Sequence, residues 1–472
     1  MSVHSRKYML ILLPLAIMFL MRWLGFDGMV GQDGYAYIDY SKSIGNWMNG
    51  EKLPYFLWPP GYSFLTYIFT WTGMPFALAG QVVSAISLAL TLWSLFGILE
   101  HYFPKSRDHI TCYLLLFALL SPYFLRQALV TSSDMLAIAL FSGFLLYYIR
   151  YLRAQSFLHL VLAILFLSLA VFTRYVIFVI AFPLLLHTIF FWFKHVGKIY
   201  HWLVLIIPVA VIFLFHLFNE NLFQFMDHDS IAKWTIKNIF GTSYESKEGI
   251  KQVKLPNIFY QLAPLIHPGF IFLGALFIFF GIKIGGFFNL EKKLLIISYF
   301  TFTVFVAGYH DQNPRHFLPC FIISILLCFP GFVHLSQRKE VRNYKNLIFS
   351  LIIIFQIGLC IRAIAPTYQR NLLEKAISAD LNNRINEKTL YAFDMDIALK
   401  SRGVPQEIQS LYTQKFTTFE NNALLLVNIP KWSNQWKNMN PMINWNLIQS
   451  AYELSVEKQF ADGWVLYKMI EK

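Results

Sequence analysis

The chain is a series of long apolar stretches separated by short polar segments. A helix that spans a bilayer needs about 20 mainly apolar residues. The stretches that approach this length are residues 8–26, 77–99, 110–125, 135–152, 157–173, 175–193, 202–219, 267–284, 293–309, 317–334 and 346–364. They predict an α-helical polytopic membrane protein with about 11 transmembrane helices.

Composition supports this prediction. Of the 472 residues, 57% are hydrophobic and 14% are charged, whereas soluble domains contain roughly 45–50% apolar and about 25% charged residues. These proportions exclude a water-soluble globule, a disordered chain and a collagen-like repeat. The cysteines lie in apolar stretches without the spacing of a zinc site, so we expect small buried side chains. They are Cys112, Cys320, Cys328 and Cys360.

The net charge of +13 is explained by topology. If the polar segments are assigned to alternate sides of the membrane, most basic residues of the short loops fall on the side of the N-terminus. They include Lys105, Arg107, Arg150, Arg153, Lys292, Lys293, Arg338, Lys339, Arg342 and Lys345. Cytoplasmic loops carry such an excess, so we predict a cytoplasmic N-terminus. We expect no nucleic-acid partner, and a bacterial inner (plasma) membrane as the location.

The larger polar segments fall on the opposite side. They are loops at 27–60 and 220–266, turns at 126–134 and 310–316, and a tail at 366–472. The tail contains short β-like runs, Leu424–Ile429 and Trp464–Met469. We therefore predict a transmembrane domain over 1–365 and a small extracytoplasmic mixed α/β domain over 366–472.

The first outer loop combines acids with aromatic residues. A helix is predicted from about Asp33 to Asn49, lying along the membrane surface. Asp33 either caps this helix or takes part in chemistry, and Asp27 and Asp39 lie nearby.

A rigid turn follows, Trp58-Pro59-Pro60-Gly61-Tyr62. The two prolines and the glycine fix an extended backbone just before an apolar stretch. The turn either simply ends the loop or places Tyr62 and the next helix against a lipid substrate.

Two further outer segments carry charge. Asp134 follows Ser132 and Ser133 at the start of the fourth apolar stretch, where it either caps the helix or orients a substrate. Arg126 binds a phosphate, pairs with Asp134 or extends to the membrane interface. Arg174, at the outer end of the fifth stretch, is either interfacial or a phosphate ligand.

The last outer turn reads His310-Asp311-Gln312-Asn313-Pro314-Arg315-His316. It offers too few ligands for zinc, whereas the planar guanidinium of an arginine matches the oxygens of a phosphate. The predicted topology places all these acids and cations at one membrane face. Such a set suits a substrate that carries a phosphate and a reacting hydroxyl.

Four of these features together resemble the GT-C class of polytopic glycosyltransferases, near the bacterial relatives of dolichyl-phosphate-mannose protein mannosyltransferases and the lipid A aminoarabinose transferase. The features are Asp33 with Tyr37, the turn at 59–62, Asp134, and the Arg-His-Phe-Leu-Pro stretch at 315–319. The overall plan of spans followed by an outer domain extends the resemblance to the whole chain. Many members of the class pair two acids in the first loop, whereas here Gly34 follows Asp33, so Asp27, Asp33 and Asp39 all stay candidates for the base.

The resemblance implies a transferase that moves a sugar from a polyprenyl-phosphate-linked donor to an acceptor hydroxyl on a lipid, glycan or protein. Asp33 would act as the base and Asp134 would orient the substrate. Arg315, Arg174, Arg126 and His316 would bind the donor phosphate, and Tyr37, Pro59, Pro60 and Tyr62 would line the substrate groove. Cations do the electrostatic work, so no cofactor is required, although a divalent metal is compatible with this chemistry.

Two other functions use the same residues. A transporter or flippase for lipid-linked sugars would bind the donor without chemistry, but it predicts polar residues at mid-span, where this sequence is apolar. A non-catalytic assembly protein would use the Trp-rich stretch at 432–445, but it has no need for acids beside a proline-fixed loop.

Overall fold

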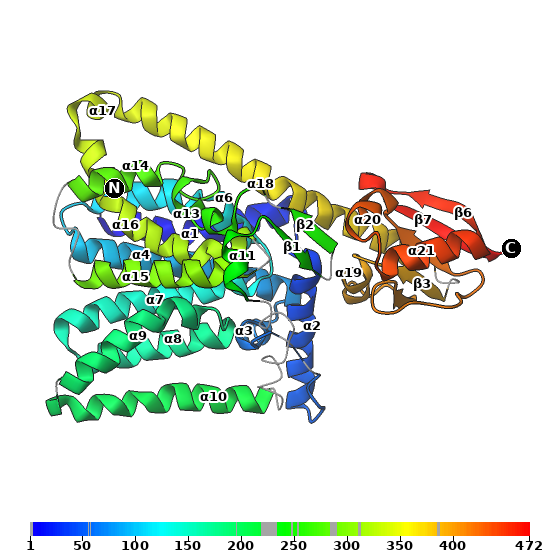
Figure 1. Cartoon of the computed structure of the whole chain (residues 1–472), viewed down its shortest axis with the longest axis horizontal. Helices are drawn as coiled ribbons and strands as arrows, with labels where there is room; N and C mark the ends of the chain where they lie inside the picture. Colours follow the sequence, from blue (N-terminus) through cyan, green and yellow to red (C-terminus); the bar gives the residue numbers. More distant parts are fainter. Residues whose placement is uncertain are drawn as a thin grey trace. The chain divides into compact units, whose positions relative to one another are not determined.

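The structure is a computed structural model of the whole chain (Figure 1). It describes residues 3–54, 56, 58–194, 196–218, 234–246, 249–252, 254–283, 290–309, 313–384 and 388–472. Helices make up 72% of it. The chain forms two compact units. Unit 1 is Met1–Gly28, Tyr40–Thr242 and Lys254–Ala365, and unit 2 is Met29–Asp39, Ser243–Val253 and Pro366–Lys472.

Unit 1 is built of helices. They are α1 (Val3–Trp23), the second half of α2 (Gly31–Met48), α3 (Gly61–Thr70), α4 (Phe76–Tyr102), α5 (Arg107–Leu114), η1 (Leu115–Leu119), α6 (Pro122–Leu129), α7 (Ser133–Ala154), α8 (Phe157–Thr173), α9 (Ile177–Lys194), η2 (Val196–Leu205), α10 (Ile206–Phe218), α11 (Ile236–Phe240), α12 (Asn257–Tyr260), α13 (Ala263–Ile266), α14 (Gly274–Lys283), α15 (Leu290–Ala307), η4 (Pro314–Phe317), α16 (Leu318–Gln337), α17 (Lys339–Asn343) and the first part of α18 (Lys345–Asn382).

The helices of unit 1 lie side by side (Figure 1). Helix α4 contacts both α1 and α7, α8 packs on α7, and α14 packs on α16. The last pair approaches closely because Gly331 has no side chain, and a Cβ there would lie 1.7 Å from the carbonyl oxygen of Phe277. The bundle therefore depends on small residues where helices meet, as is common between helices in membranes.

Each apolar stretch of the sequence contains helix in its described residues, although 267–273 lies before α14 and is not helical. Within the described residues, four helices are long and apolar enough to cross a membrane: Phe76–Tyr102, Ser133–Ala154, Pro314–Gln337 and Lys345–Asn382. Shorter apolar helices, such as Phe157–Thr173, account for other stretches. The helical, apolar character is confirmed, and the number of 11 spans stays a prediction.

One predicted span, 110–125, is broken. The α-helix α5 passes into the π-helical turn η1, and α6 then leaves at an angle of 69°. Pro122 opens α6, where a proline fits because the first amide of a helix needs no partner. The break ends the span early and directs α6 toward Asp134.

Helix α18 carries an exposed apolar surface. Along its first half the exposed side chains include Leu347, Leu351, Ile354 and Ile361, each at 57–68% exposure. Water would make such a surface costly, whereas lipid would not, so this part of unit 1 is suited to a bilayer.

Unit 2 contains a sheet that the sequence predicted for the tail. Its helices are the start of α2, the end of α18, α19 (Asp396–Ser401), α20 (Ile429–Gln435), α21 (Asn440–Ala451) and η5 (Ala461–Gly463). Its strands are β3 (Thr389–Ala392), β4 (Glu407–Ser410), β5 (Leu424–Val427), β6 (Tyr452–Gln459) and β7 (Val465–Glu471), and a separate hairpin joins β1 (Ser243–Ser246) to β2 (Gly249–Gln252).

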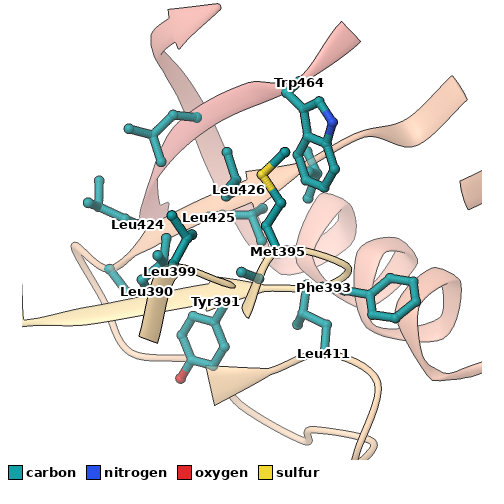
Figure 2. Packing of buried hydrophobic residues seen from close by; sticks show 14 of the residues in the cluster. Leu390, Tyr391, Phe393, Met395, Leu399, Leu411, Leu424, Leu425, Leu426 and Trp464 are labelled. Carbon is teal, nitrogen blue, oxygen red and sulfur yellow. The ribbon is translucent and has the colours of Figure 1, made fainter. Parts of the chain in front are cut away.

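The five-stranded sheet has the order β4-β3-β5-β7-β6. Strand β3 is parallel to both β4 and β5, whereas β7 is antiparallel to its neighbours. Every residue of β3 and β5 is buried, as expected for parallel strands that are covered on both faces. Figure 2 shows Leu390, Leu424 and Leu426 packed with Met395 and Trp464 in this core. The predicted small C-terminal sheet is confirmed, and the division of the chain into domains at 365/366 stays a prediction.

Candidate active site

Asp134 and Arg174 form a nearly buried ion pair in unit 1. A guanidinium nitrogen of Arg174 contacts one carboxylate oxygen of Asp134, and the two side chains are 15% and 4% exposed. Arg174 Nε also donates to Ser133 Oγ at 3.2 Å. Arg174 can bridge to the start of α7 because it follows the end of α8 in an extended conformation. The pairing joins two residues that the sequence analysis treated separately.

Ser132 caps helix α7. Its hydroxyl oxygen accepts from the Asp134 amide at 3.2 Å, and its hydroxyl donates to Asp134 Oδ2 at 2.7 Å. The alternative in which Asp134 itself is the cap is therefore wrong. The carboxylate is instead held by a hydroxyl on one oxygen and a guanidinium on the other, which fixes its orientation.

The proline turn packs beside this pair. A Cβ on Gly61 would lie 2.7 Å from the carbonyl oxygen of Phe172 and 2.9 Å from Thr173 Oγ1, immediately before Arg174. Pro59 and Pro60 are buried, and Pro60 precedes the first residue of α3. Tyr62 is fully buried, with its hydroxyl donating to the Gly80 carbonyl at 2.7 Å. The turn thus shapes the wall beside Arg174, and a role in a lipid groove stays a prediction.

The start of the first loop is fixed next to Asp134. The carbonyl of Gly28 accepts from the amide of Thr131 at 3.0 Å. Gly28 has φ +79°, and a Cβ there would lie 2.9 Å from the side chain of Gln81. Gln81 is fully buried: it donates to the Leu129 carbonyl at 2.8 Å and accepts from Arg22 at 2.9 Å. Gln81 and Arg22 were not predicted, although a polar or charged side chain inside an apolar stretch is the same signal that identified Arg126 and Arg174.

Arg126 and Arg315 extend the charged cluster. Arg126 lies on α6, close enough for its charge to interact with that of Asp134 and with that of Arg315. Arg315 lies in η4, where the side chain of Asn313 accepts from its amide at 3.1 Å. His316 follows in the same turn and is partly buried. His310 and Asp311, from the same sequence cluster, lie outside the described residues, as does much of the loop at 220–266.

Unit 1 therefore brings together three arginines and one acid that are far apart in sequence: Arg126, Asp134, Arg174 and Arg315. Asp134 is paired with Arg174, and among these four described residues the arginines outnumber the acid. Arg126 and Arg315 repel each other, and such unfavourable pairs are more common at functional sites than elsewhere. Among the described residues there is no group of three or more His, Cys, Asp or Glu side chains that could hold a metal ion.

The first-loop acids are divided between the two units. Asp27 belongs to unit 1, whereas Asp33 and Asp39 belong to unit 2. The predicted loop helix is α2, and Asp33 is in its first turn but is not the cap, because α2 begins at Gly31. Asp39 Oδ1 accepts from Ser401 Oγ at 2.9 Å. Tyr37 is buried. The convergence of Asp33 with the arginine cluster stays a prediction.

Helix α2 buries its apolar side in protein. Ile38 and Ile44 are 2% and 0% exposed. In unit 1, Tyr40 stacks on Phe56 with ring centroids 4.1 Å apart. The amphipathic pattern therefore reflects packing within the protein, and a position of the helix along the membrane surface stays a prediction.

Several solved structures share the fold of this chain. A crystal structure of ArnT from Cupriavidus metallidurans bound to undecaprenyl phosphate has a TM-score of 0.63 at 14% identity, and covers 97% of both chains. The apo form of the same protein has a TM-score of 0.62 at 13% identity, again over 97% of both chains. The apo oligosaccharyltransferase of Archaeoglobus fulgidus has a TM-score of 0.54 at 13% identity, covering all of this chain and 74% of that one. No family model and no curated relative matches the sequence.

Both neighbours are GT-C glycosyltransferases, and ArnT is the lipid A aminoarabinose transferase. The chain has the fold of this class, so the resemblance inferred from Asp33, the turn at 59–62, Asp134 and the 315–319 stretch is confirmed at the level of the fold.

Proposed function

We propose that this protein is a membrane glycosyltransferase that moves a sugar from a polyprenyl-phosphate-linked donor to an acceptor hydroxyl on the extracytoplasmic side. The observation that carries the proposal is the cluster of Arg126, Arg174 and Arg315 around Asp134, within a fold shared by two glycosyltransferases. The binding of undecaprenyl phosphate by ArnT supports a lipid-linked donor.

The reaction is a direct displacement at the anomeric carbon. The acceptor oxygen forms a bond to that carbon while the bond to the donor phosphate breaks. The electron pair leaves with the polyprenyl phosphate, and the acceptor proton passes to a carboxylate. Negative charge grows on the leaving phosphate, so guanidinium groups placed there lower the barrier.

The residues divide between these tasks. Arg126 and Arg315 bind the phosphate, since its negative charge, one in the donor phosphodiester and growing toward two as the polyprenyl phosphate leaves, relieves the repulsion between the two cations. Arg174 is partly neutralised by Asp134, which orients it toward the same charge. Asp33 is the base, and His316 and the turn at Pro59 and Pro60 shape the site. The transfer needs no metal in this proposal, and activity in the presence of a chelator tests that point.

Replacing Asp33 by Asn should abolish the transfer. The amide keeps the size of the side chain but cannot accept the proton, and general-base catalysis contributes roughly 10²- to 10⁴-fold to a rate. Asp39→Asn is the matched control on the same helix, because Asp39 already accepts a hydrogen bond from Ser401, and it should keep most of the activity. The measurement is sugar transfer from a synthetic polyprenyl-phosphate sugar by the purified full-length protein. Full activity of Asp33→Asn, with loss in Asp39→Asn or Asp27→Asn, would move the base to that residue.

The competing function is a transporter or binding protein for lipid-linked sugars without catalysis. It predicts movement or binding of the donor in reconstituted vesicles with no release of polyprenyl phosphate. Release of that lipid in step with glycosylated acceptor would favour the transferase.

A further inference from the structure

Glu374 is a buried carboxylate at the centre of unit 2. It lies on the part of α18 that belongs to this unit, and its side chain is 0% exposed. Arg370 Nε donates to Oε1 at 2.8 Å, and the hydroxyl of Tyr35 donates to Oε2 at 2.5 Å. A buried charge is tolerated only when it is paired and hydrogen-bonded, and Glu374 meets both conditions.

The partner Tyr35 comes from the first outer loop. It lies on the first part of α2, which belongs to unit 2, and its side chain is fully buried. Arg402 Nε donates to the Tyr35 hydroxyl at 2.8 Å, and an Arg402 nitrogen lies 3.8 Å from Glu374 Oε2. The arginine also covers the ring of Tyr35, with its guanidinium carbon 5.4 Å from the centroid. Tyr35 is thus enclosed by two charged residues of the C-terminal region.

Two more hydrogen bonds hold the same loop segment. Asn371 Nδ2 donates to the carbonyl of Met29 at 2.8 Å, and Ser401 Oγ donates to Asp39 Oδ1 at 2.9 Å. The segment Met29–Asp39 is therefore attached at its beginning, middle and end to residues between positions 370 and 402.

The arginine on the far side of Glu374 is itself fixed. Arg370 donates to the carbonyl of Asp394 at 2.6 Å and contacts its carboxylate at 3.3 Å, and Lys431 Nζ contacts the same carboxylate at 2.7 Å. Asp394 has φ +69°, a left-handed conformation that few side chains other than Asn and Asp adopt. The network thus reaches the end of strand β3 and the sheet of the domain.

From these contacts we propose that Glu374 and Arg402 are positioning residues for sugar transfer. Through their contacts with Tyr35, they hold the part of helix α2 that carries Asp33. Asp33 precedes Tyr35 by two residues in the first turns of α2. Side chains two apart in a helix do not face each other, and Tyr35 is buried while Asp33 stays partly exposed. The network therefore acts on the backbone beneath Asp33 through Tyr35 and not through the Asp33 side chain. A displacement of about 1 Å at a catalytic group can cost roughly 10²-fold in rate.

This proposal rests on the proposed function, in which Asp33 is the base. It is tested with Tyr35→Phe, which removes one hydroxyl and keeps the ring, and with Glu374→Gln, which removes the charge. Asp380→Asn is the matched control, because Asp380 is also an acid on α18 with two cationic partners, Arg384 and Lys458. Each purified full-length variant is assayed for kcat, donor KM, thermal stability and hydrogen exchange of the peptide 29–39.

The expected result is a fall in kcat of roughly 10- to 100-fold in Tyr35→Phe and Glu374→Gln, with donor KM near wild type in both. Tm should stay near wild type in Tyr35→Phe, whereas Glu374→Gln should also lower Tm, because it removes the carboxylate of a buried ion pair. Exchange in residues 29–39 should become faster. Asp380→Asn should leave all four measurements near wild type.

Two outcomes would overturn the proposal in distinguishable ways. Unchanged kcat in Tyr35→Phe and Glu374→Gln, with Asp33→Asn inactive, would leave the base in place and reduce the network to a structural contact. Full transfer by Asp33→Asn would remove the base and the positioning role together. If Glu374→Gln fails to fold, the decision rests on Tyr35→Phe alone.

Discussion

The two units each contain a nearly buried acid paired with arginine, and they stabilise the buried charge with different sets of partners. Asp134 in unit 1 is held by one arginine and by the hydroxyl of Ser132, which caps the same helix. Glu374 in unit 2 is held by Arg370, Arg402 and Tyr35, which come from three separate segments.

The two acids differ in the segments that their contacts connect. Asp134 is bound by Ser132 at the start of its own helix and by Arg174, so its network is compact, and further arginines lie beside it. Glu374 joins the first loop to the C-terminal domain, and its network contains three cations, Arg370, Arg402 and Lys431, and a second acid, Asp394. Attraction of a phosphate depends on local positive charge, and among these residues the unit 1 cluster has the larger excess, with three arginines to one acid.

The largest effect is expected when one partner of the unit 1 pair is removed. Arg174→Ala leaves the Asp134 carboxylate buried without its cation, which typically costs about 3–5 kcal/mol. Thermal unfolding of the solubilised protein should show a large fall in Tm, and the double variant Arg174→Ala with Asp134→Asn should recover part of it. No recovery would mean that Arg174 stabilises unit 1 by packing and not through the carboxylate.

A smaller effect, in binding and not in stability, is expected for Arg315, whose charge acts on that of Arg126. Arg315→Ala should weaken binding of undecaprenyl phosphate by about 1.5–3 kcal/mol, the usual contribution of a hydrogen bond to a charged group. The Tm should change little, because the repulsion from Arg126 disappears with the side chain. Binding is measured by titration of the lipid in detergent, with Arg384→Ala in unit 2 as the control. Equal affinity in wild type and Arg315→Ala would exclude Arg315 from the phosphate site.

Sequence reasoning predicted the fold to the extent that it follows from local patterns. Apolar length located the helices, and the runs Leu424–Ile429 and Trp464–Met469 located strands β5 and β7. The break after η1 was missed, because Ser121-Pro122 continues an apolar stretch and composition does not record the 69° bend. Proline at the first position of a new helix was the available signal.

The site was predicted as a set of residues but not as a set of contacts. Arg126, Asp134 and Arg174 were identified because charges near a membrane need a reason. Their pairing was left open, since it depends on how the end of α8 meets the start of α7. Glu374 and Arg370 were not identified at all. They lie in a polar tail where charge is ordinary, and the full burial of Glu374, which distinguishes it from the partly exposed Asp380, is not visible in the sequence.

The smallest predicted effect concerns a third acid, which differs from the two that are paired with arginine. Asp396, at the start of α19, has Oδ1 buried without a hydrogen-bond partner. Burial raises the pKa of this carboxyl, although Ser410 and nearby amides act in the opposite direction. A folded-state pKa above the unfolded value means that the ionised form destabilises the fold at neutral pH, and that this cost disappears as the pH falls through the raised pKa. Asp396→Asn should therefore raise the Tm slightly at pH 7, and the difference from wild type should shrink as the pH is lowered toward the ordinary range of an aspartate. A variant that is less stable than wild type at every pH would show that Ser410 and the amides fully compensate the charge, as the arginines do for Asp134 and Glu374.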